Sequence, residues 1–334
     1  MKKIFKNIAL ILISGLVLNG CAKREDDKNY IINTESEASD TDIVLTWNNK
    51  EIEERIGDEE GFSIKARVEV YNNKLYTGKI KKELPSKELI EKVFCDNKKM
   101  TDVTDIYINH DLPDEEVSYY YAIFDEKNEN ILQMYSFDNM SGEYQNLKYD
   151  NVHFDFLGEK ASDADANSNE IVRCEELMKA LEMNVIVSKY YGKNSNGKKL
   201  GEIYFYNSLE DVPVIDLHLG VEYTSIKIVD SEIADIRLAP NYTFIEDKKN
   251  VDSVLSPEQI IKIIRTEYDN GNITIIPDCT VDKIKLVYLE ETKGEVVPVW
   301  LFTTYYGDMD NIIFVYNALD GTKLYDVMEG FITK

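Results

Sequence analysis

The chain has 334 residues, which is enough for two or three domains with cores of their own. Its 62 acidic and 38 basic residues give a formal net charge of −24, and such a surface repels nucleic acid and anionic lipid headgroups. Apolar residues make up 43% of the chain, which excludes a wholly disordered protein. We therefore expect a folded acidic protein that binds no nucleic acid.

Residues 1–20 have the pattern of a bacterial secretion signal. Basic residues (Lys2, Lys3 and Lys6) precede an apolar run over residues 8–18, which is too short to span a bilayer as a mature helix. After Cys21, no segment approaches 18 consecutive apolar residues. We therefore expect residues 1–20 to be removed and the rest of the chain to lie outside the cytoplasmic membrane.

The sequence Leu18-Asn19-Gly20-Cys21 at the end of this signal resembles the lipobox of bacterial lipoproteins. The resemblance implies that the Cys21 thiol receives diacylglycerol and becomes the new N-terminus. Two or three acyl chains would then anchor the protein stably to the outer face of the cell membrane. The alternative is cleavage by the ordinary signal peptidase, which prefers small residues at two positions separated by one residue. Leu18 and Asn19 fit that preference poorly.

Residues 21–60 are polar and rich in acidic residues, which indicates a flexible tether between the anchor and the folded part. Residues 43–47 interrupt this composition with apolar side chains and are a candidate for docking onto the folded part. The first clear strand pattern is the alternation over Phe62–Val70. We therefore place the beginning of the folded sequence near Phe62.

Three helices are predicted by their N-terminal capping residues. Ser86 precedes an apolar face with Leu89, and Ser168 or Asn169 precedes a second face. Ser256-Pro257-Glu258-Gln259 forms a capping box with proline at the first helical position. Period-two patterns and turn residues predict strands after each helix, at residues 119–124, 131–137, 185–191, 201–206, 212–219, 224–229, 232–238, 283–291, 296–305 and 312–316.

This pattern predicts an α+β protein in which short helices pack on antiparallel sheets. The three capping residues have similar spacing along the chain, and each begins a helix followed by strands. We predict three such helix-plus-meander units, at residues 61–160, 161–250 and 251–334.

The last 80 residues resemble a known group of envelope domains. A helix over residues 257–269 is followed by Val297-Pro298-Val299-Trp300 and Tyr316-Asn317-Ala318-Leu319-Asp320-Gly321. This order is similar to the PepSY type of domain and to YycI-like regulators. The resemblance implies a helix packed on an antiparallel sheet and a non-enzymatic role, in which the domain inhibits peptidases or modulates partner proteins outside the membrane. YycI-like proteins have a transmembrane helix, so their kinase-regulating role is not carried over. The rest of the chain resembles the uncharacterised lipoproteins of low-GC Gram-positive bacteria in composition and layout.

Residues with catalytic or metal-binding chemistry form no recognised motif. Cys95, Cys174 and Cys279 are far apart in sequence, and Cys174 falls on the apolar stripe of the second helix, as a buried residue would. The alternating oxygen ligands of residues 163–169 are similar to an EF-hand loop but lack its glycine in one register and both its glycine and its final acid in the other. The three histidines (His110, His153 and His218) are isolated. We expect no cofactor, no metal and no catalytic residue.

Aromatic residues are the remaining candidates for a binding surface. Neighbouring tyrosines on a strand point to opposite faces, so the tyrosine clusters at Tyr120, Tyr191 and Tyr305 could each expose a ring to a partner. Ordinary half-buried sheet composition also explains these tyrosines. Trp300 has the same two interpretations, as a core anchor against the third helix or as a binding residue.

Taken together, the sequence predicts a membrane-anchored lipoprotein of binding or regulatory type that contacts a protein or peptide in the cell envelope. A wall-active hydrolase and a solute-capturing lipoprotein are the alternatives. A cavity with converging Asp, Glu or His side chains that have perturbed pKa values would favour the enzyme.

Overall fold

The computed structural model describes the following residues, which belong to one compact unit of the chain: 46–58, 61–94, 101–102, 119–124, 130–137, 141–146, 148, 152, 154, 169–215, 223–273, 279–291, 294–306, 309–326 and 330–331.

In these residues, backbone pairing connects 18 strands, among which we distinguish two sheets. Sheet A comprises β1 (Glu51–Ile56), β2 (Phe62–Val70), β3 (Tyr76–Glu83), β13 (Asn241–Asn250), β14 (Thr280–Glu290), β15 (Glu295–Tyr306), β16 (Met309–Asn317), β17 (Lys323–Asp326) and β18 (Gly330–Phe331). Sheet B comprises β4 (Thr101–Asp102), β5 (Tyr119–Phe124), β6 (Asn130–Phe137), β7 (Ser141–Asn146), β8 (Val185–Ser195), β9 (Lys198–Leu209), β11 (Tyr223–Val229) and β12 (Glu232–Leu238). The short strand β10 (Val212–Ile215) pairs with β9 and with β14.

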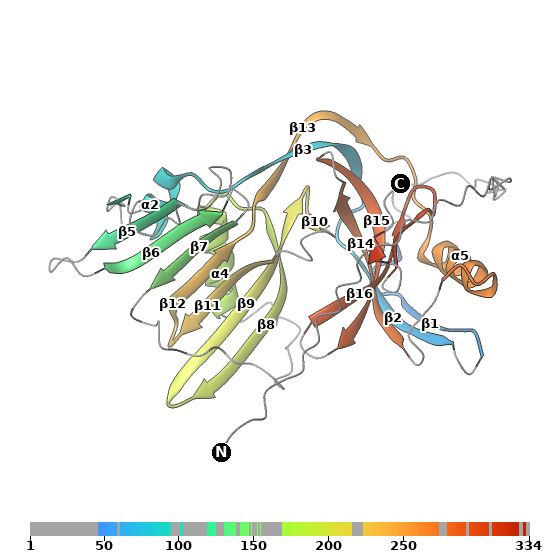
Figure 1. The fold of residues 1–334 in the computed structure, drawn as a ribbon, viewed down its shortest axis with the longest axis horizontal. Coiled ribbons are helices and arrows are strands. Elements are labelled where there is room, and N and C mark those ends of the chain that lie inside the picture. The colour runs from blue at the N-terminus through green and yellow to red at the C-terminus, as the bar shows by residue number, and fades with distance from the viewer. Residues whose placement is uncertain are drawn as a thin grey trace, which may run out of the picture. The chain divides into compact units, whose positions relative to one another are not determined.

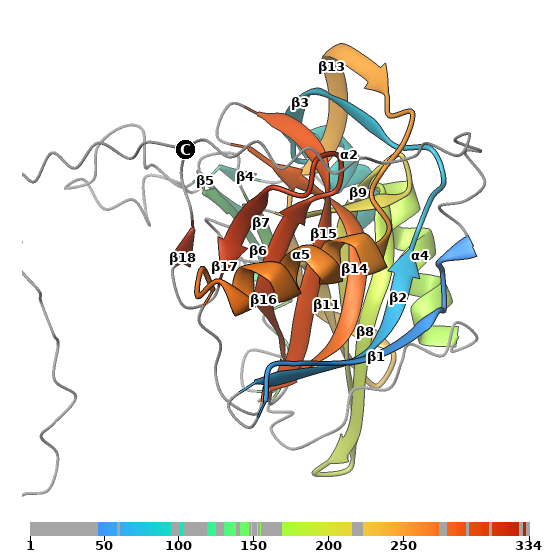
Figure 2. The same cartoon turned by 90° about the vertical axis from the view of Figure 1, so that its right-hand side faces the viewer.

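Sheet A is built around the pairing of segments that are distant in sequence. Its pairings run in the order β1-β2-β14-β15-β16-β17-β18, and β2 is parallel to β14, whereas the other neighbours in this order are antiparallel. The helix α5 (Pro257–Asp269) lies across β14, β15 and β16 (Figure 2). Its isoleucines pack against the buried Trp300 and Phe314 and form the main hydrophobic core.

Sheet B is an antiparallel sheet whose pairings run in the order β4-β5-β6-β7-β12-β11-β9-β8. The helices α2 (Lys87–Phe94) and α4 (Asn169–Ala180) contribute to its core. Ile171, Cys174 and Met178 of α4 are buried against β9, β11 and β12, as the predicted apolar stripe requires. Figure 1 shows α4 against the strands β8, β9 and β11.

The connection between β12 and β13, where the chain passes from sheet B to sheet A, is fixed by a buried polar network. The Asn207 side-chain amide donates to the carbonyls of Ala239 (3.0 Å) and Pro240 (2.7 Å). The Thr224 hydroxyl donates to Asn207 Oδ1 at 2.7 Å and accepts from the Ala239 amide at 3.1 Å. Because every one of these buried groups is paired, the network stabilises a single path of the chain.

The predicted fold class requires correction. The described part of the chain is mostly β, with α2, α4 and α5 as its described helices, rather than α+β. The reason is that the protein has strands that the sequence did not predict, among them β1, β3 and β13. β3 pairs with β13, which is distant in sequence. β1 pairs with β2, and no turn motif indicates this pairing. The strands of the first predicted unit are divided between the two sheets, since β2 and β3 lie in sheet A and β4–β7 in sheet B.

Most of the predicted local elements are confirmed. The strand Phe62–Val70, the hairpin of β5 and β6, and the hairpin of β11 and β12 are present. Ser256 caps α5 with both hydrogen bonds of the capping box. Trp47, from the segment that was a candidate for docking, packs against Trp300 with ring centroids 5.8 Å apart. The division into three units stays a prediction, and so does the tether before the described residues. The folded sequence begins earlier than predicted, because β1 lies within the predicted tether and pairs with β2.

Candidate functional site

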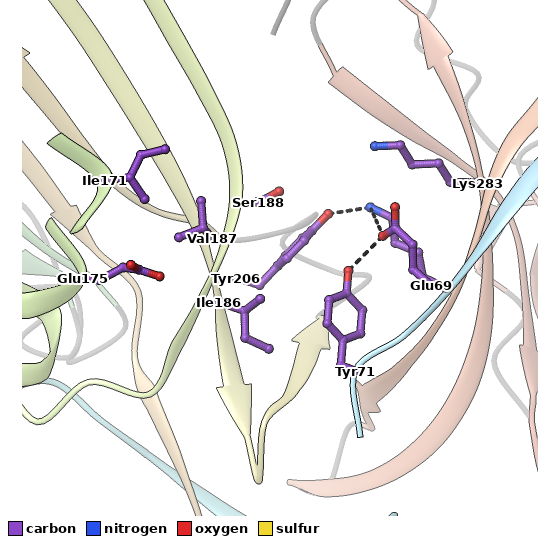
Figure 3. Close-up of a pocket in the computed structure, with 10 residues that line it drawn as sticks. Glu69, Tyr71, Ile171, Glu175, Ile186, Val187, Ser188, Tyr206 and Lys283 are labelled. Carbon is purple, nitrogen blue, oxygen red and sulfur yellow. Dashed lines mark hydrogen bonds and ion pairs between the residues drawn. The ribbon is translucent and has the colours of Figure 1, made fainter. Parts of the chain in front are cut away.

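The candidate site is a cavity of about 380 Å³ between β2 and β14 of sheet A and β8, β9 and α4 of sheet B. Its volume is at the lower end of the range of small-molecule sites. Figure 3 shows the side chains that line it. They are Glu69, Tyr71, Ile171, Glu175, Ile186, Val187, Ser188, Tyr206, Lys283 and Lys285.

The sheet A wall is polar because of the parallel register of β2 and β14. This register places Glu69 beside Lys285, and Lys283 lies two residues earlier on β14, on the same face. The neighbours of Lys285 on its own strand, Ile284 and Leu286, point to the opposite face and enter the core under α5. Over residues 283–286, the alternation of β14 therefore separates a hydrophobic face from a charged one, and the charged face becomes apolar from Val287 onward.

Four side chains form a continuous polar network across the cavity (Figure 3). The Lys285 ammonium donates to the Tyr206 hydroxyl at 2.7 Å and lies 3.9 Å from the Glu69 carboxylate. The Tyr71 hydroxyl donates to Glu69 Oε2 at 3.0 Å. Lys285 is 3% exposed, and a buried ammonium is stable only with partners of this kind. The network therefore connects sheet A directly to β9 of sheet B.

The protonation of Tyr71 is fixed by its surroundings. Burial raises the pKa of Tyr71 well above its usual value, and the nearby Glu69 carboxylate raises it further, whereas Lys285 opposes the shift. The phenol is therefore protonated at neutral pH. Tyr71 acts as a hydrogen-bond donor in this site and not as a base.

The sheet B wall depends on an irregularity in β8. Ile186, Val187 and Ser188 are consecutive, yet all three line the cavity. A regular strand would present only alternate side chains to one side. The pairing of β8 with β9 shifts register between Val187 and Lys189, which leaves Ser188 without a cross-strand partner. Such β-bulges redirect side chains and are frequent beside functional sites.

The remaining wall is a mixture of apolar and acidic side chains from α4. Ile171 is buried and Glu175 is exposed. In Figure 3, Glu175 and Lys283 lie on different walls of the cavity. The site thus offers ammonium and hydroxyl donors on one side, and apolar contacts with a single carboxylate on the other.

The described residues contain no group of three or more histidine, cysteine or acidic side chains close enough to share a metal ion. The three histidines lie outside these residues, as does the EF-hand-like segment apart from Asn169. Cys174 and Cys279 are free thiols. Burial raises the pKa of the Cys174 thiol to about 12, so this thiol is unreactive at neutral pH.

The aromatic residues that the sequence indicated lie elsewhere. Trp300 is fully buried, and its indole N–H donates to the Leu255 carbonyl at 2.8 Å. Tyr191 is 4% exposed and packs edge-to-face against Tyr204. Both rings are therefore inside the protein. The side chains of Tyr120 and Tyr305, and the whole of Leu18-Asn19-Gly20-Cys21, lie outside the described residues.

None of the cavity residues was a candidate in the sequence analysis. The signal that could have indicated them is Lys283-Ile284-Lys285-Leu286, where lysines alternate with apolar residues inside a strand that becomes wholly apolar afterwards. A strand with a continuous apolar run is buried on both faces, so a lysine at the start of that run is expected to be buried with it. Its partners could not be found in the same way, because Glu69 and Tyr206 come from distant strands.

None of the described helices combines the length and the apolar composition needed to cross a bilayer. No protein family matches the sequence, and no curated protein matches it.

Solved structures of two proteins align with most of the chain. The crystal structure of an uncharacterised protein from Eubacterium rectale ATCC 33656 is similar over 86% of this chain and 99% of that chain, with a TM-score of 0.55 and 14% sequence identity. This similarity shows a shared fold. YycH from Bacillus subtilis aligns over 79% of this chain and 57% of its own, with a TM-score of 0.34 and 13% identity. A TM-score this low supports no conclusion about fold or function.

Proposed function

We propose that this chain is a lipoprotein that is lipid-anchored on the outer face of the cell membrane. We propose that it binds a protein or peptide of the cell envelope and that it is not an enzyme. The lipid would be attached at Cys21, within the lipobox-like sequence. The binding site would be the cavity together with the adjacent edge of β8.

The observation that carries the binding role is the pairing of the ionisable groups inside the cavity. Glu69 is engaged by Lys285 and by Tyr71, and Tyr71 is kept protonated. A general base needs an accessible lone pair and a pKa suited to proton transfer. Groups that already hold one another in place are instead suited to presenting a fixed pattern of charge and hydrogen-bond donors to a ligand.

The position of β8 supports a peptide or protein partner. Among the described residues, β8 pairs with β9 on one side, and its other side borders no described strand. An extended peptide can add to such an edge through its backbone. Ile186, Val187 and Ser188 of this strand also line the cavity, so one partner could use the edge and the cavity together.

Photo-crosslinking in the native cell tests the binding site. A photoreactive amino acid replaces Ser188 in the full chain, and a matched variant carries it at Lys198, which is exposed near the turn between β8 and β9. We expect one discrete protein or peptide adduct from position 188 that is absent from position 198. Equal adducts at both positions, or none at position 188, would contradict a binding site at the cavity.

Fractionation of cells tests the anchor separately. We expect the wild-type chain to carry labelled acyl chains and to remain with the membrane, and the Cys21→Ala variant to lose the label. A variant that keeps both label and membrane association would refute attachment at Cys21.

A further inference from the structure

The two walls of the cavity carry different charge. On the sheet A wall, Lys283 and Lys285 provide two positive charges and Glu69 one negative charge, so the described residues of this wall carry one excess positive charge. Tyr71 adds a hydroxyl group to the same side, and the Tyr206 hydroxyl reaches this side from β9 of sheet B, 2.7 Å from the Lys285 ammonium. An anion that reaches this wall would meet several groups capable of charge-assisted hydrogen bonding.

The opposite wall has the reverse character. Ile171, Ile186 and Val187 provide an apolar surface, and Glu175 is its carboxylate. An anion would be repelled from Glu175 and attracted to Lys283, which fixes the orientation of a ligand that carries one negative charge beside an apolar group.

The size of the cavity limits what can enter it. A volume of about 380 Å³ corresponds to about a dozen water molecules at about 30 Å³ each. A single amino-acid residue with its carboxylate fits this space, whereas a folded segment does not. The adjacent β8 edge offers backbone groups to the residues that precede it.

We propose that the cavity binds the carboxyl-terminal residue of a peptide partner, with the terminal carboxylate at Lys283 and Lys285 and an apolar last side chain against Ile171, Ile186 and Val187. This inference rests on the proposed function and specifies the chemistry of its partner. The lysines of the cavity would bind the terminal carboxylate, and the adjacent edge of β8 would pair with the backbone of the preceding residues.

Calorimetry on the full chain in detergent micelles tests the inference with a defined pair of probes. N-acetyl-Ala-Ala-Leu carries a free carboxylate, and its C-terminal amide differs only in lacking that charge. We expect the acid to bind and the amide to bind at least about tenfold more weakly, because the amide loses the charge-assisted hydrogen bonds.

Three variants locate the effect. Lys283→Met is expected to weaken binding of the acid at least about tenfold, and Lys283→Arg, which keeps the charge, is expected to retain most of the affinity. Glu175→Gln is expected to leave the affinity for the acid unchanged or to increase it, because a like charge is removed. Lys198→Met, outside the cavity, is the matched control and should change nothing. Thermal unfolding of each variant shows whether the fold is retained.

Equal affinity for acid and amide in the wild-type chain would overturn the inference without any variant. Absence of binding at millimolar peptide, or an unchanged affinity in folded Lys283→Met, would also overturn it. If the Ser188 adduct forms in cells and its crosslinked residue is internal to the partner, the carboxylate inference fails while the proposed function stands. If no adduct forms at Ser188, the proposed function fails as well.

Discussion

Two buried threonines, Thr303 and Thr224, differ in the hydrogen bonding of their hydroxyl groups. The Thr303 hydroxyl on β15 has no hydrogen-bond partner, and the residue is 1% exposed. Thr224 on β11 is 0% exposed, and its hydroxyl both donates to Asn207 and accepts from Ala239. A buried polar group without a partner destabilises the folded state, whereas one in a complete network stabilises it.

Replacement of each threonine by valine, which has nearly the same shape, isolates the hydroxyl. We expect Thr303→Val to raise the free energy of unfolding by about 1 kcal/mol, and Thr224→Val to lower it by about 2 kcal/mol, because Asn207 and Ala239 then lose partners. Urea unfolding of the two variants and the wild type measures both changes. Effects of the same sign and size would show that hydrogen bonding does not decide the contribution of these residues.

At the scale of single elements, α5 begins with the signal that the sequence predicted most clearly. The Ser256 side chain accepts a hydrogen bond from the Gln259 amide at 3.2 Å, and the Gln259 side chain accepts from the Ser256 amide at 2.7 Å. Ser256→Ala removes one of these bonds and should lower the free energy of unfolding by about 1 kcal/mol. Ser256→Thr keeps a hydroxyl and serves as the control in the same chemical denaturation. A loss of equal size in both variants would mean that the capping bond is not the cause.

The beginning of α4 is held by an ion pair that titrates. Although burial opposes ionisation of Glu170, hydrogen bonds from Lys199 and Tyr190 lower the pKa of its carboxyl group. The stability that this contributes is fully present above the unfolded-state pKa of about 4.3 and is lost as the pH falls through the lower folded-state pKa.

We therefore expect Glu170→Gln to destabilise the protein at pH 6, and expect the difference from wild type to shrink by pH 3. Unfolding in urea at both pH values measures the difference, and Lys199→Met, which removes the partner charge, should show the same trend. A difference between Glu170→Gln and wild type that stays constant across this range would exclude a contribution from the ionised carboxylate.

The same scale shows which parts of the fold were predictable from sequence. Capping residues and the alternation of β2 are local patterns, and each predicted the correct element. Trp300 was correctly placed against the isoleucines of α5 in one of its two interpretations. The parallel pairing of β2 with β14 has no local signal, because the hydrogen bonds of parallel strands join distant segments.

The cavity could not be predicted from the sequence for two reasons, the parallel pairing of β2 with β14 and the bulge in β8. Its network needs Glu69, Lys285 and Tyr206 from three strands, two of which meet only through the unforeseen pairing. The bulge at Ser188 is a mismatch between two strands and is not visible in either one alone. Sequence patterns predict which face of a strand is buried, but they do not predict which buried faces meet.

At the scale of the whole described fold, sheet A and sheet B have separate hydrophobic clusters, apart from Leu209 of β9, which packs in the core of sheet A. Met178 lies in the core of sheet B and Ile264 in that of sheet A. The joints include β10, which pairs with strands of both sheets, the hydrogen bond between Lys285 and Tyr206, and the hydrogen bonds of Asn241 on β13 with Asn184 and Glu182. Because the ammonium of Lys285 is buried, opening the two sheets would expose its network and the strand β10 together, which favours unfolding of both sheets in one transition.

The two tryptophans of the chain, Trp47 and Trp300, make this testable, because both pack in the core of sheet A. Met178→Ala removes a fully buried side chain from sheet B and should lower the free energy of unfolding by about 2–5 kcal/mol. If the sheets unfold together, tryptophan fluorescence in sheet A reports this loss as a lower denaturation midpoint. Ile264→Ala, within sheet A, lowers the fluorescence midpoint in either case and is the positive control. An unchanged fluorescence midpoint in Met178→Ala, with an earlier transition in circular dichroism, would show that the sheets unfold independently and that the Lys285 network opens before sheet A does.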